Sequence, residues 1–212
     1  KMKAFSNGEY DIIIGTQMVA KGLDFENVTL VGVLSADQVL YSDDFRSNER
    51  GFDLLTQVVG RSGRGTKRGR AIIQTYTPEN PVIALASHQD YVHFYQQEIL
   101  FRKAMLYPPF ADIVVIGFVG EQESKVAKAS QLFLEMLSHL ASKEYSELPI
   151  RALRPTPAQV AKVSNKYRYK LMIKCKNNLT FRTMLSRLLV ACGKEKAFAG
   201  VTVYADSNPD MI

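Results

Sequence analysis

Cysteine is scarce in this chain of 212 residues. Its two cysteines, Cys175 and Cys192, lie far apart and lack the Cys-x-x-Cys spacing of a zinc site. They also supply no disulfide framework of the kind that stabilises small secreted domains. This cysteine usage favours a reduced, cytoplasmic protein.

Long apolar runs are missing as well. No stretch approaches the roughly 18 residues that a transmembrane helix needs, and the chain opens without a signal-peptide pattern. The sequence therefore predicts no membrane partner. The histidines, His88, His93 and His139, are isolated, so they indicate neither a metal site nor, with the serines and cysteines, a hydrolytic site.

Acidic residues are absent from a long part of the second half. Residues 1–105 hold 12 basic and 12 acidic residues, whereas residues 106–212 hold 15 and 9, so the whole net charge of +6 lies in the second half. Within it, residues 151–194 carry 11 basic residues and no acidic one. Most charged stretches mix both signs on a solvated face, so this asymmetry predicts an anionic partner, either a nucleic acid or an acidic peptide.

An apolar run near the start, Ile12 to Ile14, is bounded by Asp11 and Gly15 and predicts a buried parallel strand. The polar residues Thr16 and Gln17 follow directly. The carboxyl edge of such a strand is where open α/β sheets bind phosphates.

A second polar cluster brings Gln57, Arg61 and Arg64 within eight residues. The apolar spacing of residues 54–58 predicts a short helix that carries Gln57 and Arg61 on one face, with Arg64 about one turn beyond. Two guanidinium groups and an amide that converge on one point suit the charge of a phosphoryl-transfer transition state.

The spacing of apolar residues predicts two folds along the chain. In the first part, strands at 12–14, 28–34 and 71–76 alternate with a helix at 47–59, which indicates a three-layer α/β domain with a mostly parallel sheet. A helical segment follows from 82 to 105. The second part predicts strands at 112–120, 150–153, 167–174 and 201–205 with helices at 124–142 and 179–192, and this βαββαβ order is typical of an α+β ferredoxin-like fold.

At this point the motifs resemble a known family. Residues 15–25 and 57–64 resemble motifs V and VI of superfamily-2 helicases, and Gln-x-x-Gly-Arg-x-Gly-Arg is the most diagnostic piece. Narrower signatures resemble the PriA family of primosomal replication-restart helicases: Asp24–Asp37, Asp44–Arg50, Tyr107–Phe110, Arg154–Ala158 and Asp206–Pro209.

The resemblance implies a domain plan and roles. It divides the chain into residues 1–77, part of a second RecA-like helicase lobe, residues 78–107, a helical connector, and residues 108–212, a basic ferredoxin-like domain. It implies that Arg61, Arg64 and Gln57 act on the γ-phosphate of ATP, with Arg64 the finger. The remaining implied contacts are nucleotide binding by Gly22 and Asp24, and DNA binding by Thr16, Gln17 and Lys21, although Lys21 also fits a simple solvated charge.

Two interpretations of the basic surface remain open. DNA would contact Arg168 and Lys170 on one face of a strand, with Tyr167 and Tyr169 on the other face either stacking on bases or packing in the core. The resemblance adds a competing ligand, the acidic C-terminal tail of single-stranded-DNA-binding protein. Lys174, Arg182 and Arg187 are the candidates for its carboxylate.

The resemblance thus predicts the C-terminal half of an ATP-dependent 3′→5′ DNA helicase that restarts stalled forks. Its cofactors would be ATP and Mg²⁺, and its partners branched and single-stranded DNA, single-stranded-DNA-binding protein and other primosome proteins. The glycine-rich phosphate loop, the magnesium carboxylate and the family's zinc cysteines would lie in a preceding part, so this chain alone is expected to be inactive and to hold no zinc. The alternatives are a non-catalytic module that binds DNA or the acidic tail, and a superfamily-2 translocase acting on RNA.

Overall fold

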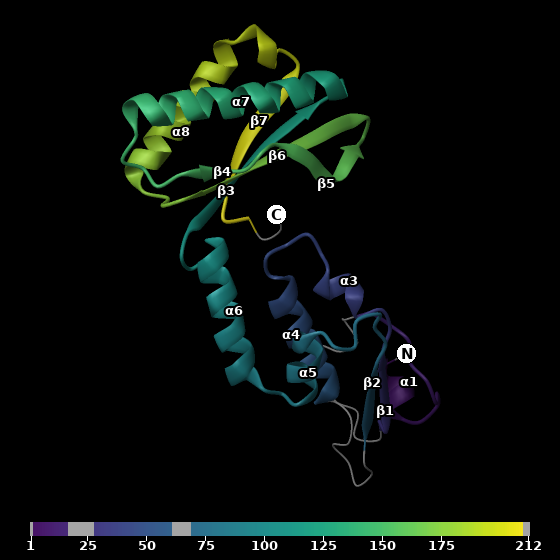
Figure 1. Ribbon diagram of the computed structural model, residues 1–212. Helices are drawn as coiled ribbons and strands as arrows, with labels where there is room; N and C mark the ends of the chain where they lie inside the picture. The colour runs from purple at the N-terminus through teal and green to yellow at the C-terminus, as the bar shows by residue number, and fades with distance from the viewer. Residues whose placement is uncertain (1, 17–27, 61–68, 210–212) are drawn as a thin grey trace. The chain divides into compact units, whose positions relative to one another are not determined.

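The computed structural model describes residues 2–16, 28–60 and 69–209. It divides into two compact units, residues 1–100 and residues 101–212, and the division falls inside helix α6 (Tyr91–Met105) (Figure 1). Each unit has its own hydrophobic core.

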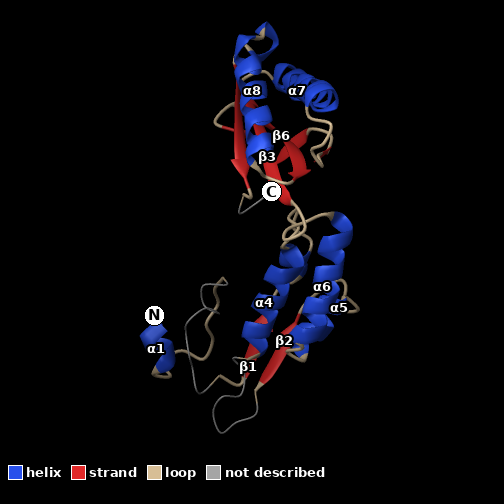
Figure 2. Cartoon of the chain, turned by 90° about the vertical axis from the view of Figure 1, so that its left-hand side faces the viewer, coloured by secondary structure: helices blue, strands red, loops and turns tan. Residues whose placement is uncertain are grey.

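The first unit is built on a parallel strand pair covered by helices. Strands β1 (Leu30–Val33) and β2 (Arg70–Ile73) pair in parallel with Leu30 opposite Arg70, and Figure 2 shows them side by side next to α4. The helices are α1 (Met2–Ser6), α3 (Asp37–Leu40), α4 (Ser47–Val59), α5 (Pro81–Ser87) and α6.

The core of the first unit lies between these helices and one face of the strand pair. Phe52 and Leu55 of α4 are buried, and the ring of Phe52 stacks on Phe94 of α6 with 4.2 Å between centroids. Helix α5 starts sharply because Asn80 accepts a hydrogen bond from the Val82 N–H and Pro81 occupies the first turn. Residues predicted as part of a connector therefore contribute to the core of the first unit.

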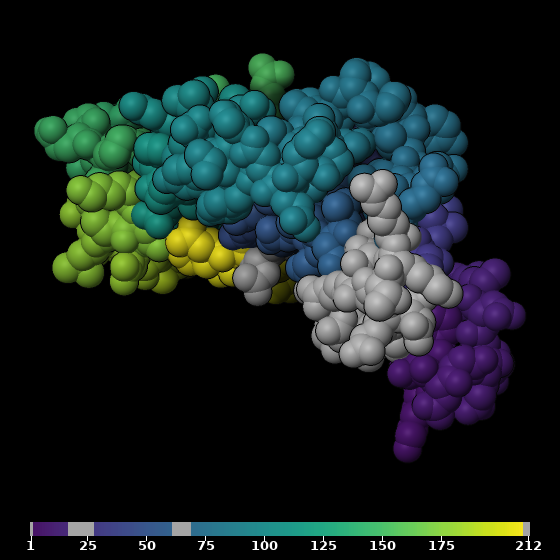
Figure 3. Space-filling view, turned by 90° about the horizontal axis from the view of Figure 1, so that it is seen from below, coloured from purple at the N-terminus to yellow at the C-terminus, as the bar shows by residue number. Residues whose placement is uncertain are grey.

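The strand predicted at Ile12–Ile14 is not formed, so this prediction was wrong. These residues adopt no regular structure, Ile14 is 88% exposed, and the N-terminal segment stands at the surface (purple in Figure 3). A strand needs a neighbour to supply hydrogen bonds, and within the described residues of this unit only β1 and β2 pair. An apolar run indicates burial in a sheet but does not say which strand lies beside it.

The second unit is an antiparallel sheet with two long helices, α7 (Glu123–Glu144) and α8 (Leu179–Lys194), on one side of it (Figure 1). The sheet order is β4-β6-β3-β7, and every adjacent pair is antiparallel. The strands are β3 (Asp112–Gly120), β4 (Arg151–Ala152), β5 (Thr156–Val163), β6 (Lys166–Cys175) and β7 (Val201–Ser207), with a short 3-10 helix at Lys196–Phe198.

The two faces of this sheet differ. Val114, Ile116 and Phe118 of β3 point into the core, where the ring of Phe118 meets Phe133 of α7 edge-on at 5.5 Å. The alternate residues of β3 lie on the other face, which we call the open face, since successive side chains of a strand point to opposite sides.

Strand β5 was not predicted from the sequence. It pairs with β6 but shifts register between Pro157 and Lys162, and seven of its eight residues are exposed. A proline within the strand and a register shift are typical of an edge strand, and an exposed strand leaves no alternating apolar pattern in the sequence.

The core can be tested by truncating one of its fully buried rings. We expect Phe118→Ala, at a residue that is 0% exposed, to lower the free energy of unfolding by about 3–5 kcal/mol because it leaves a cavity between β3 and α7. Urea denaturation measures this change. Val190→Ala at an exposed position of α8 is the control and should change stability by less than about 0.5 kcal/mol; equal effects of the two variants would contradict this assignment of the core.

Candidate nucleotide and nucleic-acid sites

The carboxyl ends of β1 and β2 are tied together by one carboxylate. Asp37, at the start of α3, accepts hydrogen bonds from the Thr75 hydroxyl at 2.9 Å and from the Tyr76 N–H at 3.1 Å, with a longer one from the Thr77 hydroxyl at 3.3 Å. The Ala36 N–H also donates to the Gln74 carbonyl. This edge of the parallel pair, where α/β proteins bind phosphates, is therefore held by a fixed polar network.

The same contacts set the charge of Asp37. Desolvation raises its pKa, but the hydrogen bonds from Thr75, from the backbone of Tyr76 and from Thr77 outweigh this effect, so the pKa of Asp37 lies below its usual value of 3.8. Asp37 is therefore a carboxylate at neutral pH, and its role is to position this edge.

Only part of the predicted nucleotide site is described. Gln57 is half-buried in the last turn of α4, which ends at Val59 with Gly60 as its C-cap, and Thr16 is exposed in a segment without regular structure. The other residues predicted to bind nucleotide or DNA in this unit lie outside the described residues: Gln17, Lys21, Gly22, Asp24, Arg61 and Arg64.

Residues Asp44–Arg50 form local hydrogen bonds and an ion pair at the start of α4. One carboxylate oxygen of Asp44 accepts a hydrogen bond from the Arg46 N–H at 2.8 Å, and the other lies 3.2 Å from a guanidinium nitrogen of Arg50. The guanidinium of Arg46 lies 4.4 Å from the centroid of the Phe45 ring. These contacts fix the loop that leads into the helix carrying Gln57.

In the second unit, the strand register places two predicted basic residues on the open face. Lys170 lies opposite Gly117, and Arg168 opposite Val119, both on the face turned away from α7 and α8. Arg168 and Lys170 are half-buried, and β6 holds no acidic residue. This row is the candidate contact with an anionic ligand.

Tyr167 and Tyr169 lie on the other face, so the expectation of exposed stacking rings was wrong. Both pack against the core and are half-buried; the Tyr169 hydroxyl lies 3.5 Å from Glu123, and the Tyr167 hydroxyl 3.4 Å from the Lys162 ammonium. Of the two readings of the tyrosines, packing in the core is the one that the structure supports. Tyrosine carries both an apolar ring and a polar tip, so strand alternation alone could not decide which face is covered.

Lys174 is not available to a carboxylate ligand, contrary to its predicted role. It is 5% exposed, donates to the Met105 carbonyl at 2.6 Å, and its ammonium lies 3.7 Å from the centroid of the Tyr107 ring. Burial lowers its pKa, and the nearby charge of Arg151 adds to this shift. A helix end leaves carbonyls without partners, so Lys174 acts as a cap for the last residue of α6.

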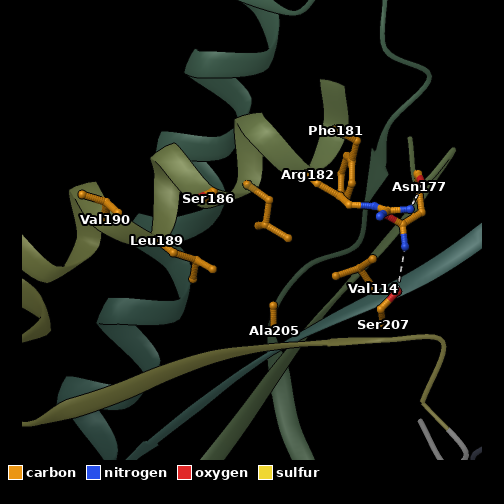
Figure 4. A pocket seen from close by; sticks show the side chains of 10 residues that line it. Val114, Asn177, Phe181, Arg182, Ser186, Leu189, Val190, Ala205 and Ser207 are labelled. Carbon is orange, nitrogen blue, oxygen red and sulfur yellow. Dashed lines mark hydrogen bonds between the residues drawn. The ribbon is translucent and has the colours of Figure 1, made fainter. Parts of the chain in front are cut away.

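Arg182 stands beside a groove of about 740 Å³ between α8, β3 and β7 (Figure 4). Its Nε donates to the side-chain oxygen of Asn177 and its Nη2 to the Asn177 carbonyl, both at 3.1 Å. Asn177 in turn donates to the Ser207 hydroxyl at 2.7 Å. The guanidinium is thus held at one end of a groove with largely apolar walls: Val114, Phe181, Leu185, Leu189, Val190 and Ala205.

Arg187, the third predicted carboxylate ligand, already has partners. Its Nη1 donates to Glu144 at 2.7 Å and to the Tyr145 hydroxyl at 2.9 Å, a pairing that joins α8 to the end of α7. The hydrogen bond and charge of Arg187 outweigh desolvation and lower the pKa of Glu144. Of the three candidates, Arg182 alone is placed to receive an external carboxylate.

Neither metal nor membrane chemistry is indicated by the residues that the structure covers. No group of three or more His, Cys, Asp or Glu side chains there is arranged to hold a metal ion, and no helix there is long and apolar enough to span a bilayer. Both cysteines are buried, and burial raises the pKa of Cys175 to about 12 and that of Cys192 to about 11. They are therefore thiols inside the core at neutral pH.

Comparison with known families shows which family the chain belongs to. Residues 103–209 match the family described as "Primosomal protein N C-terminal domain", which covers half of the chain, and residues 1–66 match "Helicase conserved C-terminal domain". The chain belongs to the family of the primosomal protein N C-terminal domain.

Relatives support this membership over the full chain. The chain is 41% identical to "Replication restart protein PriA" of Bacillus subtilis over 100% of its length and 26% of that protein, and 39% identical to the Synechocystis protein of the same name over 98% and 24%. It therefore spans about a quarter of the length of these relatives. A solved hydantoinase/carbamoylase family amidase from Burkholderia ambifaria covers 46% of this chain and 27% of its own at 18% identity, with a TM-score of 0.29, too low to indicate a shared fold.

Within the primosomal C-terminal domain, the structure adds residues that sequence reasoning missed. Asn177 holds the guanidinium of Arg182, and Tyr204 lies on the open face beside Gly117. The pairing of β3 with β7 brings Tyr204 there, and a pattern of single residues does not reveal strand pairing. The exposed aromatic residue in the final predicted strand was the only sequence signal.

The role of Asp37 predicts a pH dependence. The pKa of the Asp37 carboxyl is lower in the folded protein than in the unfolded chain, where it is near 3.8. The carboxylate therefore stabilises the fold fully above pH 3.8, and this stabilisation is lost as the pH falls through the pKa of the folded state. We therefore expect Asp37→Asn to be less stable than the parent chain at neutral pH, and we expect the difference in stability between the two to become smaller below pH 3.8. Thermal unfolding, followed by circular dichroism between neutral and acidic pH, measures this difference. Glu79→Gln, which changes an exposed carboxylate after β2, is the control. A stability difference between Asp37→Asn and the parent chain that stays constant at acidic pH would refute the assignment.

Proposed function

We propose that the chain is the C-terminal part of an ATP-dependent 3′→5′ DNA helicase that unwinds DNA at stalled replication forks. The observation that carries this proposal is the match over the whole chain to proteins named replication restart protein PriA, combined with a helicase C-terminal match over residues 1–66. The parallel strand pair with a fixed carboxyl edge supports it, because ATP-driven lobes bind phosphates at such edges.

The proposed chemistry assigns this chain the stabilisation of charge on the γ-phosphate. Arg64 acts as the finger, Arg61 binds a phosphate oxygen, and Gln57 orients the attacking water or the phosphate. ATP and Mg²⁺ supply the reacting phosphoryl group and its charge neutralisation, and the carboxylate that holds Mg²⁺ comes from another part of the protein. By this proposal the chain alone binds DNA but does not turn over ATP.

The proposed folds follow from the strand orders. We assign the first unit to a RecA-like helicase lobe because it contains a parallel strand pair with helices beside it. We assign the second to a ferredoxin-like domain because its four main strands run β4-β6-β3-β7 with every neighbour antiparallel and both helices on one face. Strand β5 is an addition to this plan.

DNA contacts are assigned to both units. In the first, Thr16, Gln17 and Lys21 contact the strand being moved, while Gly22 and Asp24 contact the nucleotide. In the second, Arg168 and Lys170 contact DNA from the open face, and the absence of acidic residues in β6 supports this. As partners we propose branched and single-stranded DNA and other primosome proteins in the cytoplasm.

A second binding function is favoured by the groove beside α8. An apolar groove with an arginine at its end is complementary to a peptide that combines apolar side chains with a carboxylate. We therefore assign Arg182 to the acidic C-terminal tail of single-stranded-DNA-binding protein. Arg187 is left out of this site because it already forms an ion pair with the Glu144 carboxylate, and Lys174 because it is buried against the Met105 carbonyl. The guanidinium of Arg182 is exposed and is bonded to the neutral Asn177.

The finger assignment is tested in the full-length protein that contains this chain. We expect Arg64→Ala to lower DNA-stimulated ATP turnover by about a thousandfold or more, because an arginine finger contributes this much to phosphoryl transfer. DNA binding, followed by fluorescence anisotropy, should stay within a few-fold. Arg70→Ala at an exposed position of β2 is the control; turnover of Arg64→Ala close to that of Arg70→Ala would remove the finger role.

The tail site is tested with a synthetic peptide of several aspartates followed by two apolar residues and a free C-terminal carboxylate. We expect Arg182→Ala to weaken its binding about ten- to a hundredfold, since a hydrogen bond to a charged group is lost, and amidation of the peptide to have a similar effect. Isothermal titration calorimetry measures both. Arg187→Ala should bind as the parent does, and a larger loss in Arg187→Ala than in Arg182→Ala would contradict the assignment.

A further inference from the structure

The open face of the second unit carries an exposed tyrosine on its edge strand, β7. The register of the sheet places Tyr204 of β7 opposite Gly117 of β3, and Gly117 opposite Lys170 of β6. One pair further along, Thr202, Val119 and Arg168 form the neighbouring row. The two basic residues predicted to meet DNA therefore share a face with Tyr204 and not with Tyr167 and Tyr169.

Gly117 determines how the tyrosine lies. A Cβ atom at position 117 would come within 3.0 Å of three atoms of the Tyr204 side chain, namely Cζ, Cε1 and the hydroxyl oxygen. The hydroxyl end of the ring thus lies across β3 above the backbone of Gly117, in space that any side chain would fill. Tyr204 still keeps 43% of its surface exposed. The glycine fixes an aromatic ring on the sheet without burying it.

The charges around the ring favour an anionic ligand. The side chain of Arg168 makes no hydrogen bond or ion pair with the described part of the chain, and Arg168 is two residues from Lys170 along β6, on the same face. The one acidic residue nearby on β7 is Asp206, which lies in the row of Val115 and Met172 on the side away from Arg168. Arg168 therefore lies on the side of the Tyr204 row away from Asp206, and Arg151 of β4, opposite the buried Lys174, is a further exposed cation at the other end of the face.

We propose that Tyr204 stacks on a base of single-stranded DNA at the open face, with Gly117 providing the space for the ring and Arg168 and Lys170 binding the adjoining phosphates. An aromatic ring flanked by cations is the arrangement that binds single strands without sequence preference, because every base offers a π-face while the backbone offers charge. Bases paired in a duplex are not available to such a ring. This proposal rests on the DNA-binding role proposed for this unit, and it adds that the unit recognises single-stranded DNA.

A protein ligand fits this face less well. A peptide recognised by a sheet face needs apolar pockets, and the described groove of the second unit lies on the opposite side, between α8 and the helix-covered face of β3 and β7. On the open face the ring shares its row with Lys170. The neighbouring rows hold Arg168, Val119 and Thr202 on one side and Met172, Val115 and Asp206 on the other, and none of these residues lines the described groove.

The test measures fluorescence anisotropy of the chain with a labelled single-stranded oligothymidine and with a duplex of the same length. We expect Tyr204→Ala to weaken binding to the single strand about five- to a hundredfold, the loss of one stacked base. Tyr204→Phe should restore most of the binding because the ring remains. Gly117→Ala should weaken it in the same direction by displacing the ring; its folding is checked by thermal unfolding, and Tyr204→Phe keeps the test informative if that variant is unstable.

Salt titration separates stacking from charge. Arg168→Gln should reduce the slope of log affinity against log salt by about 0.7, the value for one phosphate contact on a single strand. Tyr204→Ala should leave this slope unchanged while it lowers affinity at every salt concentration. Tyr76→Ala, which removes a ring that is 90% exposed in the first unit, is the control and should bind like the parent chain.

Three results would overturn the proposal in distinguishable ways. If Tyr204→Ala binds the single strand like the parent chain while Arg168→Gln binds it less tightly, DNA meets this face without stacking on Tyr204. If Tyr204→Ala weakens the duplex and the single strand equally, the ring does not recognise an unpaired base. If Arg168→Gln, Lys170→Gln and Tyr204→Ala all bind like the parent chain, the DNA-binding role of the open face itself fails.

Discussion

The antiparallel pairing of β3 with β6 is the constraint on which the second unit depends. Nine residue pairs, from Asp112 opposite Cys175 to Gly120 opposite Tyr167, fix the register. Because side chains alternate along a strand, this single register sends Leu171 and Ile173 to the helices and Arg168 and Lys170 to the open face. A shift by one residue would bury the cations and expose the core, so packing and the basic face are specified by the same pairing.

The basic residues of this unit are not equivalent, although they look alike in the sequence. Lys174 is buried and caps α6, Arg187 joins α8 to α7, and Arg182 is held by Asn177 at the end of a groove. A buried cation is tolerated only when the fold supplies its partners, as Lys174 finds in the Met105 carbonyl and the Tyr107 ring. Net charge therefore overstates the surface available to an anion, and only the cations left at the surface can bind one.

The sequence predicted the second unit better than the first for a physical reason. Helices α7 and α8 and strands β3, β6 and β7 have long, regular apolar patterns because their neighbours lie within the same unit. Residues 12–14 have an equally apolar pattern but no strand beside them among the described residues, so the pattern alone gave a wrong strand. Similarly, alternation correctly separated Tyr167 and Tyr169 from Arg168 and Lys170, but it could not say which face the helices cover.

The candidate sites also differ in whether their residues are close together or far apart in the sequence. A motif such as residues 57–64 is local, so the sequence alone indicates its chemistry. The open face is instead made of residues from three strands that are separated by long stretches of chain: Gly117, Lys170 and Tyr204. None of these residues is unusual by itself. Only the strand order β6-β3-β7 places a glycine, which has no side chain, between a cation and an aromatic ring. A glycine in the interior of a strand weakens the strand, so its presence at the centre of β3 requires a reason, and the ring that lies over it supplies one.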